Sequence, residues 1–138
     1  MIVDGDGAIL GRLASKISKD LLRGEQIIVI NAEKIIISGN PKAVLERYRE
    51  KTKRGSPHKG PFYPRYPDRL FRRAVRGMLP YKKKRGRNAY NKLKVYMGNP
   101  DNLKGEKKGK TIDDLKSKYI TLKDLGKKLG AKVGQEKN

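Results

Sequence analysis

The chain has 138 residues, of which 35 are Lys or Arg and 14 are Asp or Glu, so its net charge is +21. It contains no cysteine, which excludes a disulfide framework and any site built on thiolates. No apolar run approaches the roughly 20 residues that a transmembrane helix needs. The length predicts a single domain over residues 1–138. The first residues, MIVDGDG, resemble neither a signal peptide nor a transit peptide, so we expect a cytoplasmic protein.

The positive charge is concentrated in the middle of the chain. Residues 1–46 are neutral overall, whereas residues 47–94 contain eighteen basic and two acidic residues, a net charge of +16. Residues 95–138 carry +5. A compact segment with this charge repels itself unless an anionic partner neutralises it, and a polyphosphate such as RNA is the obvious partner. A solvated face or a disordered tail is the alternative, but this segment is internal and contains seven Phe and Tyr residues.

In the first part of the chain, short apolar runs typical of strands alternate with segments of helical periodicity. This order predicts parallel strands joined by right-handed crossovers. The run Ile27–Ile30 is typical of a strand buried on both faces. Asn40 and Pro41 suit the cap and the first position of a helix, which is expected to turn Ala43, Val44 and Tyr48 inward. The other predicted elements are a short apolar segment at 1–4, a helix at 10–22 closed by a left-handed Gly24, and an apolar run at 35–37.

Residues 52–67 are expected to form a loop, because they contain four prolines and two glycines. Aromatic and basic side chains alternate along this loop, and His58 is the only histidine of the chain. Such a segment cannot bury itself, but it can lie along RNA, stacking on exposed bases and pairing with phosphates. The alternative is a proline-rich linker.

Residues 68–79 predict an amphipathic helix with arginines on one face. At about 100° per residue, one side gathers Leu70, Phe71, Ala74, Val75, Met78 and Leu79, and the other Arg69, Arg72, Arg73 and Arg76. Asp68 is placed to cap this helix and Pro80 to end it. Docking through Phe71, Val75 and Met78 would orient the four guanidinium groups together, toward phosphate. The segment Lys82–Arg87 then adds five cations in six residues.

The candidate RNA-binding residues are basic and aromatic side chains of the loop, of the arginine helix and of nearby segments. They are Arg12, Lys34, Lys51, Lys53, Arg54, His58, Lys59, Tyr63, Arg65, Tyr66, Arg69, Arg72, Arg73, Arg76, Lys82, Lys83, Lys84, Arg85, Arg87 and Lys92. We predict no catalytic residue, no metal ligand and no cofactor. Recognition should be mainly of RNA shape and backbone, with few contacts to base edges.

The C-terminal part begins with a predicted strand at 93–97 and continues as a lysine-rich extension over residues 99–138. We expect a flexible loop at 104–110, one helical turn at 111–115 and a short extended piece at 119–120. A short helix should follow, capped by Thr121 and closed by Gly130. Its buried side is predicted to consist of Leu122, Leu125 and Leu129.

An enzymatic alternative depends on the glycines near the N-terminus. Gly5, Gly7 and Gly11 follow a strand and open a helix, which is where a dinucleotide-binding fingerprint belongs, and Glu33 after the next strand could face a ribose. The spacing is one residue too long for GxGxxG. A tight turn and close helix packing explain the same glycines. A nucleotide-binding α/β enzyme is therefore the second hypothesis.

Several segments together resemble the universal ribosomal large-subunit protein L-thirteen family. They are Gly11-Arg12-Leu13-Ala14-Ser15, Val29-Ile30-Asn31-Ala32-Glu33-Lys34-Ile35 with Ser38-Gly39, Ala74-Val75-Arg76-Gly77-Met78-Leu79-Pro80, and Leu93-Lys94-Val95-Tyr96-Met97-Gly98. The 52–67 loop and the lysine-rich C-terminus resemble the archaeal and eukaryotic branch. This resemblance covers residues 1 to about 98.

The resemblance implies a three-layer α/β/α domain around a four-stranded parallel sheet of order 3-2-1-4, with the basic loop and the C-terminal extension added to it. It also implies a structural, non-enzymatic role: binding large-subunit ribosomal RNA and supporting subunit assembly. The implied partners are this RNA and neighbouring large-subunit proteins, among them the protein L-three, with no membrane and no small-molecule substrate.

Overall fold

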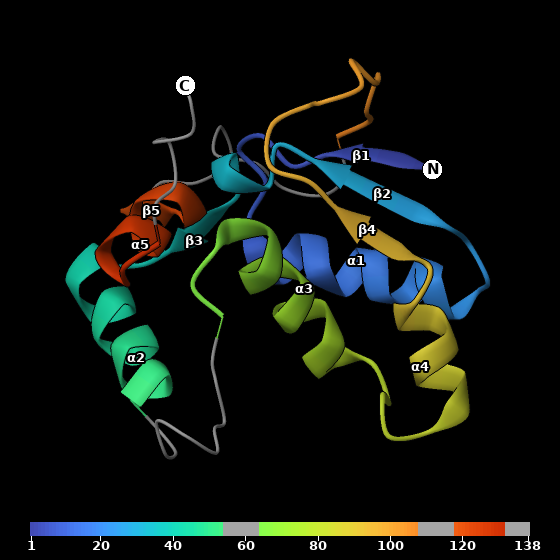
Figure 1. The fold of residues 1–138 in the computed structure, drawn as a ribbon, viewed down its shortest axis with the longest axis horizontal. Helices are drawn as coiled ribbons and strands as arrows, with labels where there is room; N and C mark the ends of the chain where they lie inside the picture. Colours follow the sequence, from blue (N-terminus) through green and yellow to red (C-terminus); the bar gives the residue numbers. More distant parts are fainter. Residues whose placement is uncertain (54–63, 108–117, 132–138) are drawn as a thin grey trace.

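A computed structural model of the chain describes residues 1–53, 64–107 and 118–131 (Figure 1). The predicted turn at 111–115 and most of the 52–67 loop lie outside these residues. In chain order the elements are β1 (Ile2–Asp4), α1 (Leu10–Leu22), β2 (Ile27–Ile30), a 3-10 turn (Ala32–Lys34), β3 (Ile36–Ser38), α2 (Pro41–Lys53), α3 (Pro67–Met78), α4 (Lys84–Tyr90), β4 (Leu93–Val95), β5 (Tyr119–Thr121) and α5 (Leu122–Lys128).

The main sheet has three parallel strands in the order β1-β2-β4. Val3 is in register with Val29, and Val29 with Val95, and all three side chains are buried. The prediction of parallel strands is therefore confirmed. The predicted four-stranded order 3-2-1-4 is wrong, because β4 lies beside β2 and β3 is not part of this sheet.

The third predicted strand pairs elsewhere. β3 forms a separate antiparallel pair with β5, with Ile37 opposite Ile120. Only residues 31–35 separate β2 from β3, whereas a parallel crossover takes about a dozen residues or more. The short connection carries the chain out of the main sheet, and the C-terminal extension supplies the partner strand.

The outer edge of β1 is closed by the chain that follows β4. The amide of Asp4 donates to the carbonyl of Glu106 at 2.9 Å, and the amide of Glu106 donates to the carbonyl of Ile2 at 3.0 Å. This segment takes the position beside β1 where the predicted order placed β4, and β4 lies beside β2 instead. A closed edge also protects a short sheet from pairing with other chains.

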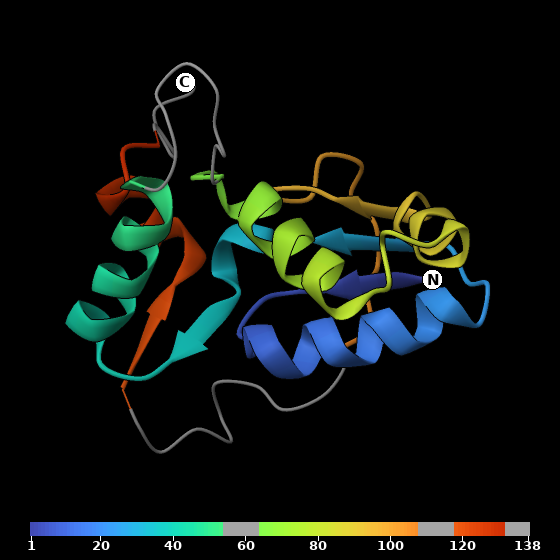
Figure 2. The same cartoon turned by 90° about the horizontal axis from the view of Figure 1, so that it is seen from below.

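The predicted three-layer arrangement is not what the described residues form. Helices α1 and α3 lie side by side on one face of the three-stranded sheet (Figures 1 and 2). On the other face Ile28 is half-buried and Lys94 is exposed. The run Ile27–Ile30 is thus not covered equally on both faces, and β-branched composition alone did not show this.

Local signals place the helix ends well. The Asn40 side chain accepts from the amide of Lys42 at 2.9 Å, and the Thr121 side chain accepts from the amide of Asp124 at 3.1 Å. Gly24 and Gly130 adopt positive φ values of 97° and 107°, as predicted. Asp68 lies in the first turn of α3, but Tyr66 occupies the cap position and supplies no side-chain hydrogen bond.

Ala43 of α2 is exposed, against the prediction, whereas Val44 next to it is buried. The helical pattern of α2 was too weak to fix its buried side. None of the helices in the described ranges is long and apolar enough to cross a membrane.

Helix α4 was not predicted, because its sequence KRGRNAY was treated as part of a basic cluster. Its buried residues are Gly86 and Ala89. A Cβ on Gly86 would collide with the carbonyl of Pro80, so glycine lets α4 fold back closely on the end of α3. This contact fixes the direction in which the basic cluster leaves the core.

We expect Gly86→Ala to destabilise the protein by about 1–3 kcal/mol, because overpacking against backbone cannot relax easily. Gly11→Ala in α1 is the matched control: a Cβ there meets nothing within 4 Å, and alanine is the better helix former. Urea unfolding followed by circular dichroism measures both. Equal stability of the two variants would contradict the close approach at Gly86.

Helix α3 is anchored by Phe71, which is fully buried, together with Leu70, Val75 and Leu79. The predicted anchor Met78 is instead 46% exposed. Met78 is the last residue of α3, and at this end of the helix the buried side chains are those of Val75 and Leu79.

Phe71→Ala should therefore cost about 3–5 kcal/mol of unfolding free energy. Met78→Ala should change it by less than about 0.5 kcal/mol, as is usual for exposed positions. Chemical denaturation of the two variants compares them directly, and a neutral Phe71→Ala would mean that Phe71 is not a core residue.

Candidate nucleic-acid interface

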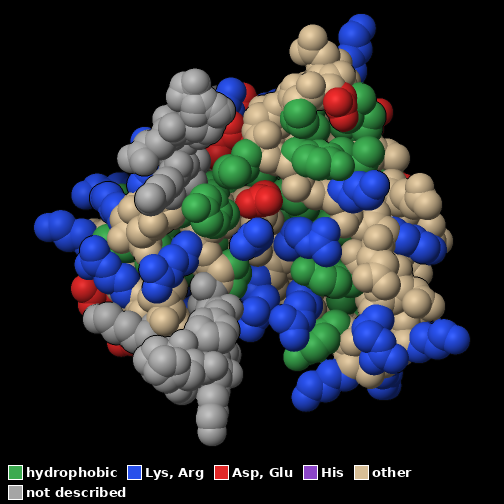
Figure 3. Space-filling view, viewed as in Figure 1, with side chains coloured by type: hydrophobic (Ala, Val, Ile, Leu, Met, Phe, Trp, Pro, Cys, Tyr) green, Lys and Arg blue, Asp and Glu red, His purple; other side chains and the backbone are tan. Residues whose placement is uncertain are grey.

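The arginines of α3 meet the segment before it at an open groove of about 460 Å³. Its lining consists of Pro64, Arg65, Tyr66, Arg69, Arg72, Arg73, Arg76 and Tyr90. Among the described residues, the lining contains five guanidinium groups and two phenol rings, and no carboxylate. Lys and Arg side chains gather over α3 and α4 (Figure 3), so the groove lies within a wider basic face.

Tyrosine rings support three of these arginines. The guanidinium carbon of Arg76 lies 4.1 Å from the ring centre of Tyr81, and that of Arg72 lies 4.6 Å from the ring of Tyr90. Arg69 lies over Tyr66 at the longer distance of 5.9 Å. A cation stacked on a ring face keeps its in-plane N–H groups directed outward. The stacking therefore orders the arginines without using their donors.

Arg72 differs from its neighbours because its donors are already used. Its Nη1 donates to the carbonyl of Leu93 at 2.7 Å, and its Nε donates to the hydroxyl of Tyr90 at 3.3 Å. Leu93 is the first residue of β4, so Arg72 ties α3 to the edge of the sheet. The helical wheel placed Arg72 on the solvent face, but a long side chain can bridge to a neighbouring strand.

The structure brings together six of the predicted binding residues around the groove: Arg65, Tyr66, Arg69, Arg72, Arg73 and Arg76. The cations Lys82, Lys83, Lys84, Arg85 and Arg87 are exposed in and before α4. Arg87 donates to the carbonyl of Lys82 at 2.8 Å, which closes the turn that leads into α4.

The other predicted residues that the structure describes do not line the groove. Arg12 and Lys34 are exposed on α1 and the 3-10 turn, Lys51 stacks on Tyr48 at 4.7 Å, and Lys92 reaches the carbonyl of Gly24 at 3.5 Å. Lys53 ends α2, but its side chain lies outside the described residues, as do Arg54, His58, Lys59 and Tyr63.

The sequence did not identify Tyr81 and Tyr90 as part of the site. Both lie beside the basic cluster, but Tyr90 is eighteen positions from the arginine that it supports. The fold-back of α4 brings the Tyr90 ring to α3, whereas Tyr81 lies in the turn directly after α3. An aromatic residue next to a basic run was the one signal available.

The backbone amides of the glycine turn near the N-terminus are hydrogen-bonded within the protein. The N–H groups of Gly5, Gly7 and Ala8 donate to the carbonyls of Ile30, Lys34 and Gly5 at 2.9–3.0 Å. The N–H of Asp6 donates to Asp4 Oδ1 at 2.9 Å. A phosphate-binding loop works through amides that are free to reach the ligand, and these four are not.

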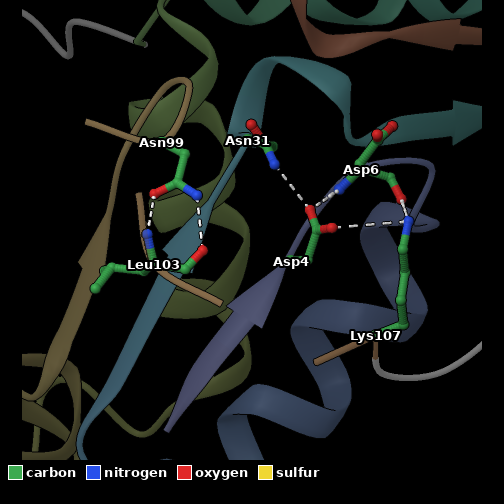
Figure 4. A network of polar contacts seen from close by, with 6 residues as sticks. All are labelled: Asp4, Asp6, Asn31, Asn99, Leu103 and Lys107. Atoms are coloured by element: carbon green, nitrogen blue, oxygen red, sulfur yellow. Dashed lines mark hydrogen bonds and ion pairs between the residues drawn. The ribbon is translucent and has the colours of Figure 1, made fainter. Parts of the chain in front are cut away.

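The Asp4 carboxylate holds this turn in place (Figure 4). Its Oδ1 also accepts from the side-chain amide of Asn31 at 2.9 Å, and Lys107 lies 3.9 Å from its Oδ2. Lys107 in turn donates to the carbonyl of Asp6 at 2.7 Å. Glu33, the candidate ribose ligand, accepts from the amide of Gly98 at 2.9 Å. These contacts assign the turn a structural role.

Comparison with known proteins agrees with this basic, non-catalytic surface. The sequence model of ribosomal protein L13 matches residues 1–102. The chain belongs to the ribosomal protein L13 family. Members of this family are structural components of the ribosome and not enzymes. The matched residues end at 102, before β5 and α5.

Archaeal relatives match almost the whole chain. The large ribosomal subunit protein uL13 of Archaeoglobus fulgidus is 51% identical, over 94% of this chain and 86% of the relative. The proteins of the same name from Methanocaldococcus jannaschii and Methanosarcina barkeri are 48% and 47% identical, each over 95% of this chain and 98% of the relative. These matches extend over the C-terminal part that follows the family match.

Arg72→Ala should lower the free energy of unfolding by about 1.5–3 kcal/mol, because it removes a charge-assisted hydrogen bond and leaves the Leu93 carbonyl without this donor. Arg69→Ala, which loses only a long ring contact, should change stability by about 0.5 kcal/mol or less. Thermal unfolding of both variants gives the comparison. If both are equally stable, Arg72 is a surface residue and not a tie to the sheet.

Proposed function

We propose that this protein is a structural constituent of the large ribosomal subunit that binds ribosomal RNA through the arginine groove and the basic surface around it. The observation that carries the proposal is the groove itself: five arginines converge on it, and none of the described residues that line it is acidic. The relatives named large ribosomal subunit protein uL13 support the same function. No catalysis is required, and the protein supports assembly by neutralising phosphates.

The proposed mechanism of RNA binding depends on how the fold positions α3 and its arginines before RNA binds. The buried face of α3 holds the helix on the core, and the contact with the Tyr81 ring holds Arg76 at the groove. Planar guanidinium groups pair with phosphate oxygens through two parallel N–H bonds. Because the cations are ordered before binding, less side-chain entropy is lost when RNA arrives.

The exposed cations in and before α4 extend the same surface, and Arg12, Lys34, Lys51 and Lys92 would contact RNA from its margins. The predicted residues Lys53, Arg54, His58, Lys59 and Tyr63 complete the proposed RNA-binding set. Phosphate contacts of this kind fix position and orientation, whereas base contacts add specificity.

Neighbouring large-subunit proteins, among them the protein L-three, are the further partners of this proposal. Tyr96 and Met97 after β4 are 36% and 39% exposed and offer apolar contact away from phosphate. One core cluster includes residues from Val3 to Leu129, which supports a single domain over residues 1–138. The protein is expected to be cytoplasmic, as part of the ribosome.

The test is filter binding of the purified protein to large-subunit rRNA fragments across a salt series, with duplex DNA as competitor. If about six to ten phosphates are neutralised, the slope of log K against log[salt] should lie between about −5 and −9. Tight binding to particular fragments supports the proposal. Equal binding to every polyanion, DNA included, would contradict it.

The double variant Arg69→Ala/Arg76→Ala should weaken binding and make this slope shallower by about 1 to 2, one phosphate contact for each arginine. Its unfolding midpoint should stay nearly unchanged. Lys16→Ala/Lys19→Ala on the exposed side of α1 is the charge-matched control. If the control weakens binding as much, net charge and not the groove determines affinity.

A further inference from the structure

We propose that the groove is a subsite for one unstacked nucleotide of the RNA, with its base against Tyr66 and its phosphate between Arg69 and Arg76. This inference rests on the proposed function and adds to it the kind of RNA element that the groove accepts. A paired helix would present only backbone to this face. A bulged or looped nucleotide would enter the groove.

The size of the groove supports a whole nucleotide. Sites for small organic ligands have volumes of roughly 300–1,000 Å³, and this groove has about 460 Å³. One phosphate group needs much less space. The volume therefore suits a base together with its phosphate.

The two tyrosines that line the groove have different roles: Tyr90 is held by contacts within the protein, and Tyr66 is accessible to a base. The Tyr90 hydroxyl accepts from Arg72, and its ring face carries the guanidinium of Arg72. Tyr66 lines the same groove, is 37% exposed, and has only the distant stack with Arg69 at 5.9 Å. Unpaired bases of RNA stack on exposed aromatic side chains of this kind.

The arginines divide in the same way. Arg72 donates hydrogen bonds from Nε to the Tyr90 hydroxyl and from Nη1 to the Leu93 carbonyl, and it forms a wall of the groove. Arg69 and Arg76 make ring contacts, and among the described residues neither donates a hydrogen bond to a protein oxygen. Their in-plane N–H groups suit phosphate oxygens.

Backbone contacts hold Tyr66 in position before any ligand binds. Its carbonyl accepts from the amide of Leu70 at 2.8 Å. Helix α5 approaches the residue before it so closely that a Cβ on Gly126 would lie 2.7 Å from the Arg65 carbonyl. Pro67 follows as the first residue of α3. Tyr66 thus stands on a fixed support next to the arginines.

The test compares two RNA hairpins with equal numbers of phosphates, one fully paired and one with a single bulged 2-aminopurine. Anisotropy titration of the full chain at fixed salt should show about tenfold tighter binding to the bulged hairpin, as expected for one stacked base. The emission of 2-aminopurine should fall on binding, because the base stacks on a tyrosine ring.

Tyr66→Ala should reduce the bulge preference to near onefold and abolish the emission change, while affinity for the paired hairpin stays within about twofold. Tyr66→Phe keeps the ring and should retain both effects. Tyr119→Ala is the control, because Tyr119 is similarly exposed, at 39%, but lies on β5 outside the groove.

Equal wild-type affinity for the two hairpins overturns the inference, as does a bulge preference that survives in Tyr66→Ala. Either result leaves the proposed function intact if rRNA fragments are still selected over duplex DNA. Loss of that selection contradicts the proposed function itself, so the two failures are distinguishable.

Discussion

The burial of one face of α3 is the constraint on which the rest of this structure depends. Phe71, Leu70 and Val75 are almost fully buried, and α1 lies beside them on the same face of the sheet. Once these side chains are buried, the arginines between them must point away from the core, because a helix repeats every 3.6 residues. The apolar face therefore determines where the positive charge is presented.

Concentrating five guanidinium groups at one groove raises the free energy of the unbound protein through repulsion. Two features reduce this cost. Tyr66, Tyr81 and Tyr90 place ring faces against three of the cations, and Arg72 is held by the Leu93 carbonyl at the edge of β4. The repulsion that remains favours an anionic partner, so the same arrangement that strains the free protein provides part of the drive for RNA binding.

The N-terminal turn shows how similar glycine patterns serve different purposes. Gly7 has a positive φ of 74°, and a Cβ on Gly5 would lie 2.8 Å from Ile35 Cγ1. These glycines are needed because the chain turns tightly between β1 and α1 and passes close to its neighbours. Their amides bond to the protein itself, whereas a nucleotide-binding loop keeps its amides for the ligand.

The sequence by itself determined most of the local elements, the concentration of basic side chains and the family. Periodicity and capping residues gave α1, α3 and α5 within about a residue of their observed ends, because those signals act between residues close in the chain. It did not determine which strands pair, that α4 forms, or that Arg72 is tied to Leu93. Each of these depends on contacts between distant segments: a short connection after β2, the approach of α4 to Pro80 allowed by Gly86, and an edge left open on β4. Only the tertiary structure brings such groups together, since burial and hydrogen bonding across the fold, not local preference, decide them.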